Sequence, residues 1–202
     1  LQGQRLQVRA GSRIGGRGGR MAEGELLFTQ YGLSGTAVLD ISEDISIALN
    51  RDGLQDVAVV LDLLPGMTAA DVAGELSRRM TAGWETRSLV SGLLPEKFGP
   101  LVPQLAGEAG TAAGKGDPRE KARRLAAALK RMEFAVQGTR GWNEAEFTAG
   151  GVDAREVKPG TLESKLRHGL YLAGEVLDVQ GGRGGYNLAW AWASGSVAGL
   201  TD

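Results

Sequence analysis

Short segments in which apolar residues recur at every second position dominate the first third of the chain and predict β-strands. Residues 4–10 alternate in part, residues 25–29 form a second short apolar segment, and residues 57–63 form a third, longer one. Glycine- and arginine-rich residues 11–20 separate the first two and predict the loop of a hairpin. Residues 1–64 are therefore expected to form a β-rich part.

The segment between the second and third predicted strands combines two signals. Ser34 is a candidate N-cap for a short helix through Ala37, Val38 and Ile41. Ile45, Ile47 and Leu49 then alternate, and residues 50–53 have the composition of a turn. We expect the alternating segment to form a hairpin with residues 57–63.

The apolar spacing becomes helical after Pro65. Thr68 and Asp71 resemble a capping box, and the apolar residues that follow on one helical face are Val72, Leu76 and Met80. Prolines then limit the next helices to short pieces, at positions Pro95, Pro100 and Pro103. Residues 107–116 are expected to be a flexible linker.

A further helix is expected to start at Asp117, Pro118 and Glu120, which supply a cap, a first-turn proline and an early acidic residue. Its predicted buried stripe is Ala122, Leu125, Ala126, Leu129 and Met132. Its opposite face is basic, with Arg119, Lys121, Arg123, Arg124, Lys130 and Arg131. Residues 65–131 are therefore expected to be a helical part, whose basic face is either solvated or meets an acidic partner or a nucleotide phosphate.

The chain is expected to return to strands at residues 134–137 and 144–148. A short apolar strand over 169–173, a glycine loop over 181–185 and a helix over 186–199 complete the pattern. The predicted fold class is α+β, divided into the parts 1–64, 65–131, 132–160 and 161–202.

Composition excludes several classes of protein. A net charge of −1 over 202 residues excludes a globally basic nucleic-acid binder. The absence of Cys excludes disulfides and thiolate metal sites, and the single histidine, His168, excludes a two-His metal site. No apolar run reaches the roughly 20 residues of a membrane helix, and Leu1 starts no signal-peptide pattern. We expect a cytoplasmic protein, and the ends look like those of a piece of a longer chain.

The last forty residues carry the strongest chemical signal. Glu175 follows the predicted 169–173 strand, and the glycine loop precedes the helix that starts near Asn187. A carboxylate at a strand end can accept hydrogen bonds from ligand hydroxyls, and a helix N-terminus offers free N–H groups to an electron-rich atom. The same pattern also fits a turn followed by a buried helix, and the residues by themselves leave both interpretations open.

Five segments resemble a known family. Residues 169–179 (Gly-Leu-Tyr-Leu-Ala-Gly-Glu-Val-Leu-Asp-Val) and 185–195 (Gly-Tyr-Asn-Leu-Ala-Trp-Ala-Trp-Ala-Ser-Gly) are similar to the C-terminal FAD-binding segment of a bacterial flavoprotein family. This is the family of NAD(P)/FAD-dependent oxidoreductases related to aminoacetone oxidase and the 3-dehydro-bile-acid reductases. Residues 24–35, 148–152 and 161–165 match further motifs in the order and at about the spacing of the family.

The resemblance implies an architecture. In the family, a Rossmann-type domain with a Gly-x-Gly-x-x-Gly turn holds the FAD pyrophosphate, and a β-barrel-like insertion with a small helical subdomain follows. The chain then returns with a strand–helix piece that completes the FAD domain. This sequence has no strand–Gly-x-Gly-x-x-Gly–helix unit, because residues 15–20 (Gly-Gly-Arg-Gly-Gly-Arg) lack the βαβ context. The chain thus resembles a C-terminal half, whose missing N-terminal FAD-binding half is its expected partner.

The resemblance also assigns cofactor-binding residues. Glu175, next to Gly174, would bind the ribityl chain of the flavin, and the start of the last helix would face the pyrimidine edge of the ring. That start comprises Gly184, Gly185, Tyr186, Asn187 and Leu188. The segment that would line the flavin–substrate side comprises Thr148, Ala149, Gly150 and Gly151. The chain departs from the family pattern at Gln30, Thr36 and Gly182-Arg183, which makes the substrate harder to infer than the cofactor.

The resemblance implies a flavin-dependent oxidoreductase that transfers hydride at flavin N5 to or from a small organic substrate, with NAD(P)H as a candidate electron donor. This fragment alone is expected to be inactive, and no catalytic residue is assigned. His168 is interpreted as an exposed residue rather than a catalytic acid or base. Trp190 and Trp192 cannot share one helical face, so one is expected to pack on the sheet.

A second hypothesis comes from the Arg-Gly residues 13–20, which resemble a short RNA-binding tract. It describes a non-catalytic module that binds RNA or an acidic partner. The tract lacks interleaved aromatic residues, and a mobile hairpin loop explains it as well. The first hypothesis includes no nucleic-acid partner and no membrane partner.

Overall fold

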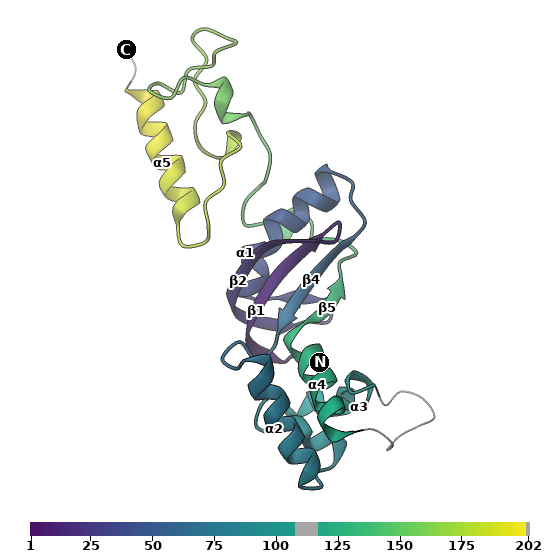
Figure 1. Ribbon diagram of the computed structural model, residues 1–202. Coiled ribbons are helices and arrows are strands. Elements are labelled where there is room, and N and C mark those ends of the chain that lie inside the picture. Colours follow the sequence, from purple (N-terminus) through teal and green to yellow (C-terminus); the bar gives the residue numbers. More distant parts are fainter. Residues whose placement is uncertain (108–116, 201–202) are drawn as a thin grey trace. The chain divides into compact units, whose positions relative to one another are not determined.

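A computed structural model describes residues 1–107 and 117–200 of the chain. The chain divides into two compact units, 1–137 and 138–202. Figure 1 shows a sheet with helices in the first unit and irregular chain with one long helix in the second. The predicted return segment 132–160 is shared between the two units.

The first unit contains one five-stranded antiparallel sheet with strand order β3-β2-β1-β4-β5. The two long strands, β1 (Arg5–Ile14) and β2 (Arg17–Phe28), form the predicted hairpin, joined at Gly15 and Gly16. Because β1 and β2 extend through the Arg-Gly residues, these form ladder pairs such as Arg13 with Gly18, and only the tip is a turn. β4 (Val57–Asp62) lies between β1 and β5 (Met132–Ala135), and β3 (Leu33–Ser34) pairs with the end of β2.

The helix α1 (Thr36–Ser46) packs against β1 and β2 (Figure 1). Its buried residues Ala37, Ile41 and Ile45 recur every four residues and meet the buried strand residues Val8, Ala10 and Leu26. A π-helical segment, Ile47–Arg51, continues it. The predicted hairpin of residues 45–49 with 57–63 is therefore wrong, because burial at helical spacing outweighs the strand preference of the isoleucines.

Gly35, not Ser34, is the N-cap of α1, and no side chain caps the helix. Gly35 has φ 96°, and a Cβ there would lie 2.4 Å from the carbonyl oxygen of Glu25. The close approach of the helix start to β2 explains why glycine occupies this position.

The helical part of the first unit follows the prediction. α2 (Ala69–Thr81) has the full capping box of Thr68 and Asp71 and buries Val72 and Leu76. Short helices follow at Thr86–Val90, Glu96–Leu101 and α3 (Val102–Leu105). α4 (Pro118–Lys130) is capped by Asp117 and buries Ala122, Leu125, Ala126 and Leu129. Met132, which was predicted to belong to the buried stripe of α4, is instead the first residue of β5. The predicted linker 107–116 lies, from residue 108 on, outside the residues that the structure describes.

The second unit has little regular structure before α5 (Tyr186–Gly199). Three 3-10 turns, Trp142–Glu144, Ala154–Glu156 and Gly174–Val176, precede it. Its core comprises Val157, Leu162 and Leu177, with Trp190 packed against them. Two predicted strands are wrong here. Residues 144–148 begin at the last residue of a 3-10 turn and form no strand, and residues 169–173 make one isolated bridge, between Tyr171 and Glu163. Neither segment has a continuous strand beside it to complete a ladder.

Candidate functional site

Two of the predicted cofactor-binding segments lie side by side in the second unit. The Val152 N–H donates to the carbonyl of Val176, and the Asp178 N–H donates back to the carbonyl of Val152, both over 2.8 Å. Just before these residues in both segments, the Thr148 N–H donates to Glu175 Oε1 over 2.6 Å. Residues 148–152 and 175–178, far apart in the sequence, therefore form one structural element.

Glycines make this close approach geometrically possible. Gly151 has φ 149°, and a Cβ there would lie 2.6 Å from the carbonyl oxygen of Val176. The N–H of Gly150 donates to Asp178 Oδ1 over 2.9 Å, and a Cβ at Gly150 would meet nothing within 4 Å. Gly150 thus leaves open space beside the paired segments, and Ala149 lies half-buried next to it.

Glu175 is placed differently from the prediction. It lies in the 3-10 turn Gly174–Val176 rather than at the end of a strand. Its side chain is held by the Thr148 N–H, and the residue is exposed. The carboxylate is thus fixed in position while it remains accessible to a ligand hydroxyl.

The N-terminus of α5 carries the third predicted segment. Gly184 and Gly185 have φ 113° and 89°, and Gly185 is the N-cap without a side-chain cap. Asn187 is tied to Gly181 by two hydrogen bonds, of 2.7 Å from the Gly181 N–H and 3.2 Å to its carbonyl. Tyr186 and Leu188 are each 66% exposed. An uncapped helix N-terminus presents N–H groups and a partial positive charge to an electron-rich ligand.

Three further side chains connect these segments, and of these the sequence analysis had singled out neither Ser194 nor Gln180. Ser194 Oγ is buried, accepts the Gly174 N–H over 2.8 Å and donates to the Trp190 carbonyl over 2.6 Å. Trp190 Nε1 donates to the Gly174 carbonyl over 3.1 Å, and Gln180 Nε2 donates to Asp178 over 2.6 Å. A polar residue such as Ser194 within an apolar helix was the signal in the sequence that could have indicated these contacts, because a buried hydroxyl needs a hydrogen-bond partner.

The two tryptophans of α5 separate as expected from their spacing. Trp190 packs against Val157, Leu162 and Leu177, which is the small core of the second unit rather than the sheet. Trp192 is 78% exposed. The exposed residues of α5 therefore include the large apolar side chains Leu188 and Trp192.

His168 is exposed, as expected, and its Nδ1 lies 2.6 Å from Glu163 Oε1. Glu163 is buried and also accepts the Gly169 N–H, which together with the Lys158 ammonium lowers the pKa of Glu163 to about 2. Contacts of Glu163 with Lys158, His168 and Gly169 thus join the two ends of the loop that precedes Gly174.

The Arg-Gly tract is largely neutralised by acids. Arg13 pairs with Asp56 and Glu133, and Arg20 pairs with Glu43. In the described ranges, no group of three or more His, Asp or Glu residues gathers closely enough to hold a metal ion, and no helix is both long and apolar enough to cross a membrane.

Comparison with known proteins decides the family. The family described as HI0933-like protein Rossmann domain matches residues 8–201. The chain belongs to the HI0933-like family. The resemblance inferred from the motifs is confirmed, and the mixed helix–strand composition agrees with the predicted fold class.

The HI0933-like chain is 36% identical to the 3-dehydro-bile acid delta(4,6)-reductase of Clostridium scindens over 87% of its own length and 43% of that protein. It is 34% identical to the ribosomal RNA dihydrouridine synthase of Haemophilus influenzae, over 91% of this chain and 43% of that protein. The corresponding protein of Escherichia coli is 33% identical, over 95% and 46%. The chain therefore spans less than half the length of the curated relatives it matches.

Proposed function

We propose that this chain is part of a flavin-dependent oxidoreductase and contributes one side of its FAD site. The observation that carries the proposal is the Thr148–Glu175 hydrogen bond, together with the pairing of Val152 with Val176 and Asp178 beside it. Two segments with independent resemblance to flavoprotein motifs meet there, in the same unit as the uncapped start of α5. Family membership supports the oxidoreductase class.

The residues present fit a flavin. Gly150 and Gly185 leave space where any side chain would project, so a planar ring can approach the backbone. Glu175 Oε1 is occupied by the Thr148 N–H, and Oε2 is the oxygen proposed to accept a ribityl hydroxyl. The N–H groups at the start of α5 are proposed to face the electron-rich pyrimidine edge of the ring.

When bound, FAD supplies the chemistry by accepting or delivering a hydride at N5, with NAD(P)H as the proposed electron donor. The partial positive charge at the start of α5 stabilises negative charge on the reduced ring. Glu175 orients the cofactor, and residues 148–151 are proposed to line the side on which the substrate lies. The substrate proposed here is a small organic molecule.

The proposal extends to the rest of the parent protein. The adenosine half of FAD is assigned to a part with the strand–Gly-x-Gly-x-x-Gly–helix unit, which this sequence lacks. Residues 1–64 and 132–160 are proposed to form a barrel-like insertion, interrupted by the helical part 65–131. Residues 161–202 then complete the FAD domain, and the isolated chain is inactive.

Flavin titration tests the proposal. The full-length protein is expected to purify with a flavin absorption spectrum, whereas the isolated 202-residue chain is expected to bind added FAD several orders of magnitude more weakly. A full-length protein that binds no flavin would overturn the proposed function. Tight one-to-one binding of FAD by the isolated chain would overturn the assignment of the adenosine half to another part.

A second candidate reaction is the reduction of a base in RNA, since two of the relatives are named for ribosomal RNA dihydrouridine synthesis. The observation in this chain that favours it is a set of arginines on α4 without acidic partners among the described residues. The full-length protein with FAD and NAD(P)H would then add two hydrogens to uridine, which mass spectrometry of digested ribosomal RNA detects. An unchanged RNA, together with reduction of a small organic molecule by the same enzyme, would favour the first candidate.

A further inference from the structure

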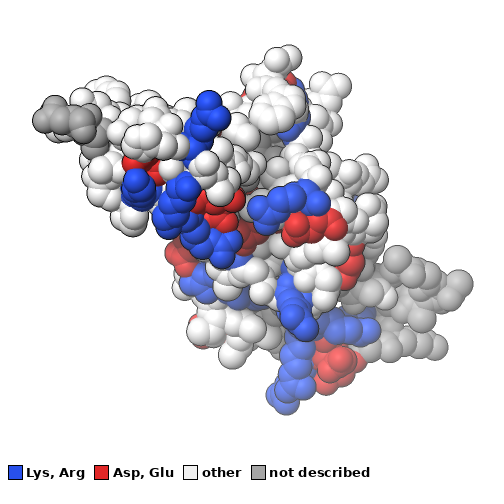
Figure 2. All heavy atoms as spheres, turned by 90° about the horizontal axis from the view of Figure 1, so that it is seen from above, with Lys and Arg blue, Asp and Glu red and all other residues white. Residues whose placement is uncertain are grey.

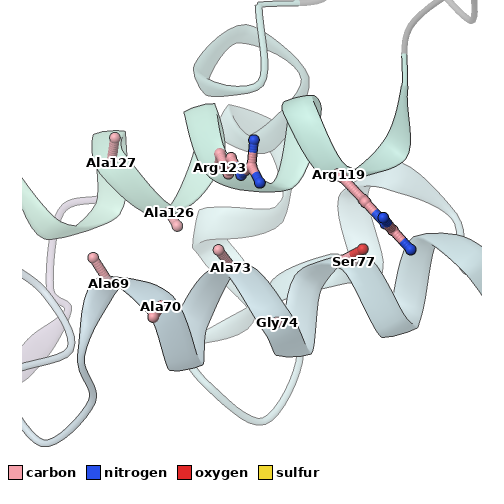
Figure 3. A pocket seen from close by; sticks show the side chains of 9 residues that line it. All are labelled: Ala69, Ala70, Ala73, Gly74, Ser77, Arg119, Arg123, Ala126 and Ala127. Atoms are coloured by element: carbon pink, nitrogen blue, oxygen red, sulfur yellow. The ribbon is translucent and has the colours of Figure 1, made fainter.

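The first unit has a groove between α2 and α4 that the proposed flavin site does not use. Its volume is about 580 Å³. The residues that line it from α2 are Ala69, Ala70, Ala73, Gly74 and Ser77, and those from α4 are Arg119, Arg123, Ala126 and Ala127. Figure 3 shows the small side chains along both helices, with Arg119 extended toward Ser77. The groove is therefore lined by small side chains and by two cationic groups.

Arg119 and Arg123 differ from most arginines of this chain. Arg9, Arg13 and Arg78 each pair with a carboxylate. On the face drawn in Figure 2, Lys and Arg likewise lie beside Asp and Glu in most places. Within residues 1–107 and 117–200, neither Arg119 nor Arg123 has an ion pair or a side-chain hydrogen bond. Two guanidinium groups thus remain available for an external anion.

Gly74 is a position of α2 at which no side chain projects into the groove. It lies in the middle of α2 without a positive φ, where glycine disfavours a helix relative to alanine. A Cβ at Gly74 would meet no atom within 4 Å, so packing inside the chain does not require glycine. Because glycine has no side chain, a ligand in the groove can approach the backbone of α2 closely at this position.

The geometry suits the phosphates of a nucleic-acid backbone. Arg119 and Arg123 are one helical turn apart, about 6 Å along the axis of α4. The planar guanidinium group is well matched to phosphate oxygens. The lining has no aromatic residue on which an unpaired base could stack, and no large apolar residue that could anchor a protein. Double-stranded RNA, which proteins contact through phosphates and shape, is the occupant that fits.

We propose that the α2–α4 groove docks the phosphate backbone of a double-stranded RNA segment. The proposal rests on the second candidate reaction, in which RNA is the substrate. It departs from the sequence-based hypothesis of an Arg-Gly tract as the RNA contact, because the tract is paired with acids whereas the α4 arginines are not.

The test measures binding of a fluorescein-labelled RNA hairpin to the full-length protein by anisotropy at several salt concentrations. The double variant R119Q/R123Q is expected to bind about ten- to thirtyfold more weakly, with the slope of log K against log salt reduced by about two. The matched control, R5Q/R51Q, removes two exposed arginines that pair with Glu25 and Asp52, and is expected to bind almost as the parent does.

Gly74→Glu provides a second variant, which places a carboxylate in the groove and favours the helix. It is expected to weaken RNA binding as strongly as R119Q/R123Q, with unchanged circular dichroism. A single strand is expected to bind more weakly than the hairpin, and polyglutamate is expected to compete poorly. Efficient competition by polyglutamate would indicate an acidic protein as the occupant and overturn the proposal.

The outcomes distinguish a wrong assignment of the groove from a wrong choice of RNA as the substrate. If the unsubstituted full-length protein binds no hairpin, both the groove and the RNA-substrate candidate fail. If it binds but R119Q/R123Q and Gly74→Glu have no effect, or the control loses as much, the groove alone is overturned. None of these measurements requires flavin, so failure of the FAD proposal leaves the result unaffected.

Discussion

The backbone N–H of Thr148 donates to the carboxylate of Glu175 over 2.6 Å, across 27 positions of sequence. This bond fixes the rotamer of an exposed acid that otherwise has several accessible conformations. It also joins the segment that ends at Val152 to the turn Gly174–Val176, from which the chain leads to α5. A preorganised acceptor loses less conformational entropy when a ligand hydroxyl binds to it.

Glu175→Ala in the full-length protein is expected to weaken FAD binding by about 1.5–3 kcal/mol, which is roughly ten- to a hundredfold in affinity. The physical reason is the loss of a charged acceptor for ligand hydroxyls and of the Thr148 partner. Flavin content after dialysis and a fluorescence titration measure it. Glu156→Ala removes an exposed acid from the same unit and serves as the control. Equal FAD retention in both variants would contradict the role of Glu175.

Ser194→Ala is expected to destabilise the second unit by about 1–3 kcal/mol, because the buried Gly174 N–H loses its acceptor. Urea unfolding followed by tryptophan fluorescence reports the change, since Trp190 packs against the core of this unit. Ser196→Ala, an exposed position two residues away on α5, is the matched control. If the two substitutions shift the midpoint equally, the Ser194 hydrogen bond does not anchor α5.

Helix starts with explicit local chemistry could be predicted from the sequence. Thr68 and Asp71 form the capping box, and Asp117 with Pro118 starts α4, because each cap depends only on residues within one turn. The family resemblance assigned residues 148–151 and Glu175 to the same cofactor, but it did not predict the contact between them. Nothing in the local sequence specifies a hydrogen bond across 27 positions.

Segments whose state depends on distant partners were predicted wrongly. Ile45 and Ile47 have strand preference, yet Ile41, Ile45 and Ala48 bury one helical face against the sheet. Residues 169–173 are apolar enough for a strand, yet only Tyr171 finds a bridge partner. In both cases burial and the availability of a neighbouring strand decided the outcome, and neither is encoded within the segment itself.

The Glu163 cluster predicts an acid-sensitive loop. The pKa of Glu163 is lowered to about 2 from 4.5, first by the Gly169 N–H and then by Lys158. Because the folded-state pKa lies below the unfolded one, the stabilisation is fully present above pH 4.5 and is lost as the pH falls toward about 2. Amide exchange of residues 158–171 is expected to accelerate in that window. The variant Glu163→Gln keeps every other acid, including Asp153, and is expected to exchange faster at neutral pH with a flatter dependence.

Gly151→Ala tests whether the pairing of 150–152 with 176–178 is what builds the proposed site. Gly151 has φ 149°, and an added Cβ would lie 2.6 Å from the backbone carbonyl of Val176, which cannot move away as a flexible side chain could. The two segments are expected to separate, with loss of the 2.8 Å bonds between Val152 and both Val176 and Asp178.

In the full-length protein FAD retention should fall at least as far as in Glu175→Ala, because the Thr148 N–H moves away as well. Gly160→Ala, at a position without positive φ and with open space, is the control and is expected to retain flavin. Full retention by Gly151→Ala would mean that flavin affinity does not depend on this pairing, and the proposed line of contacts from Thr148 to Asp178 would be abandoned.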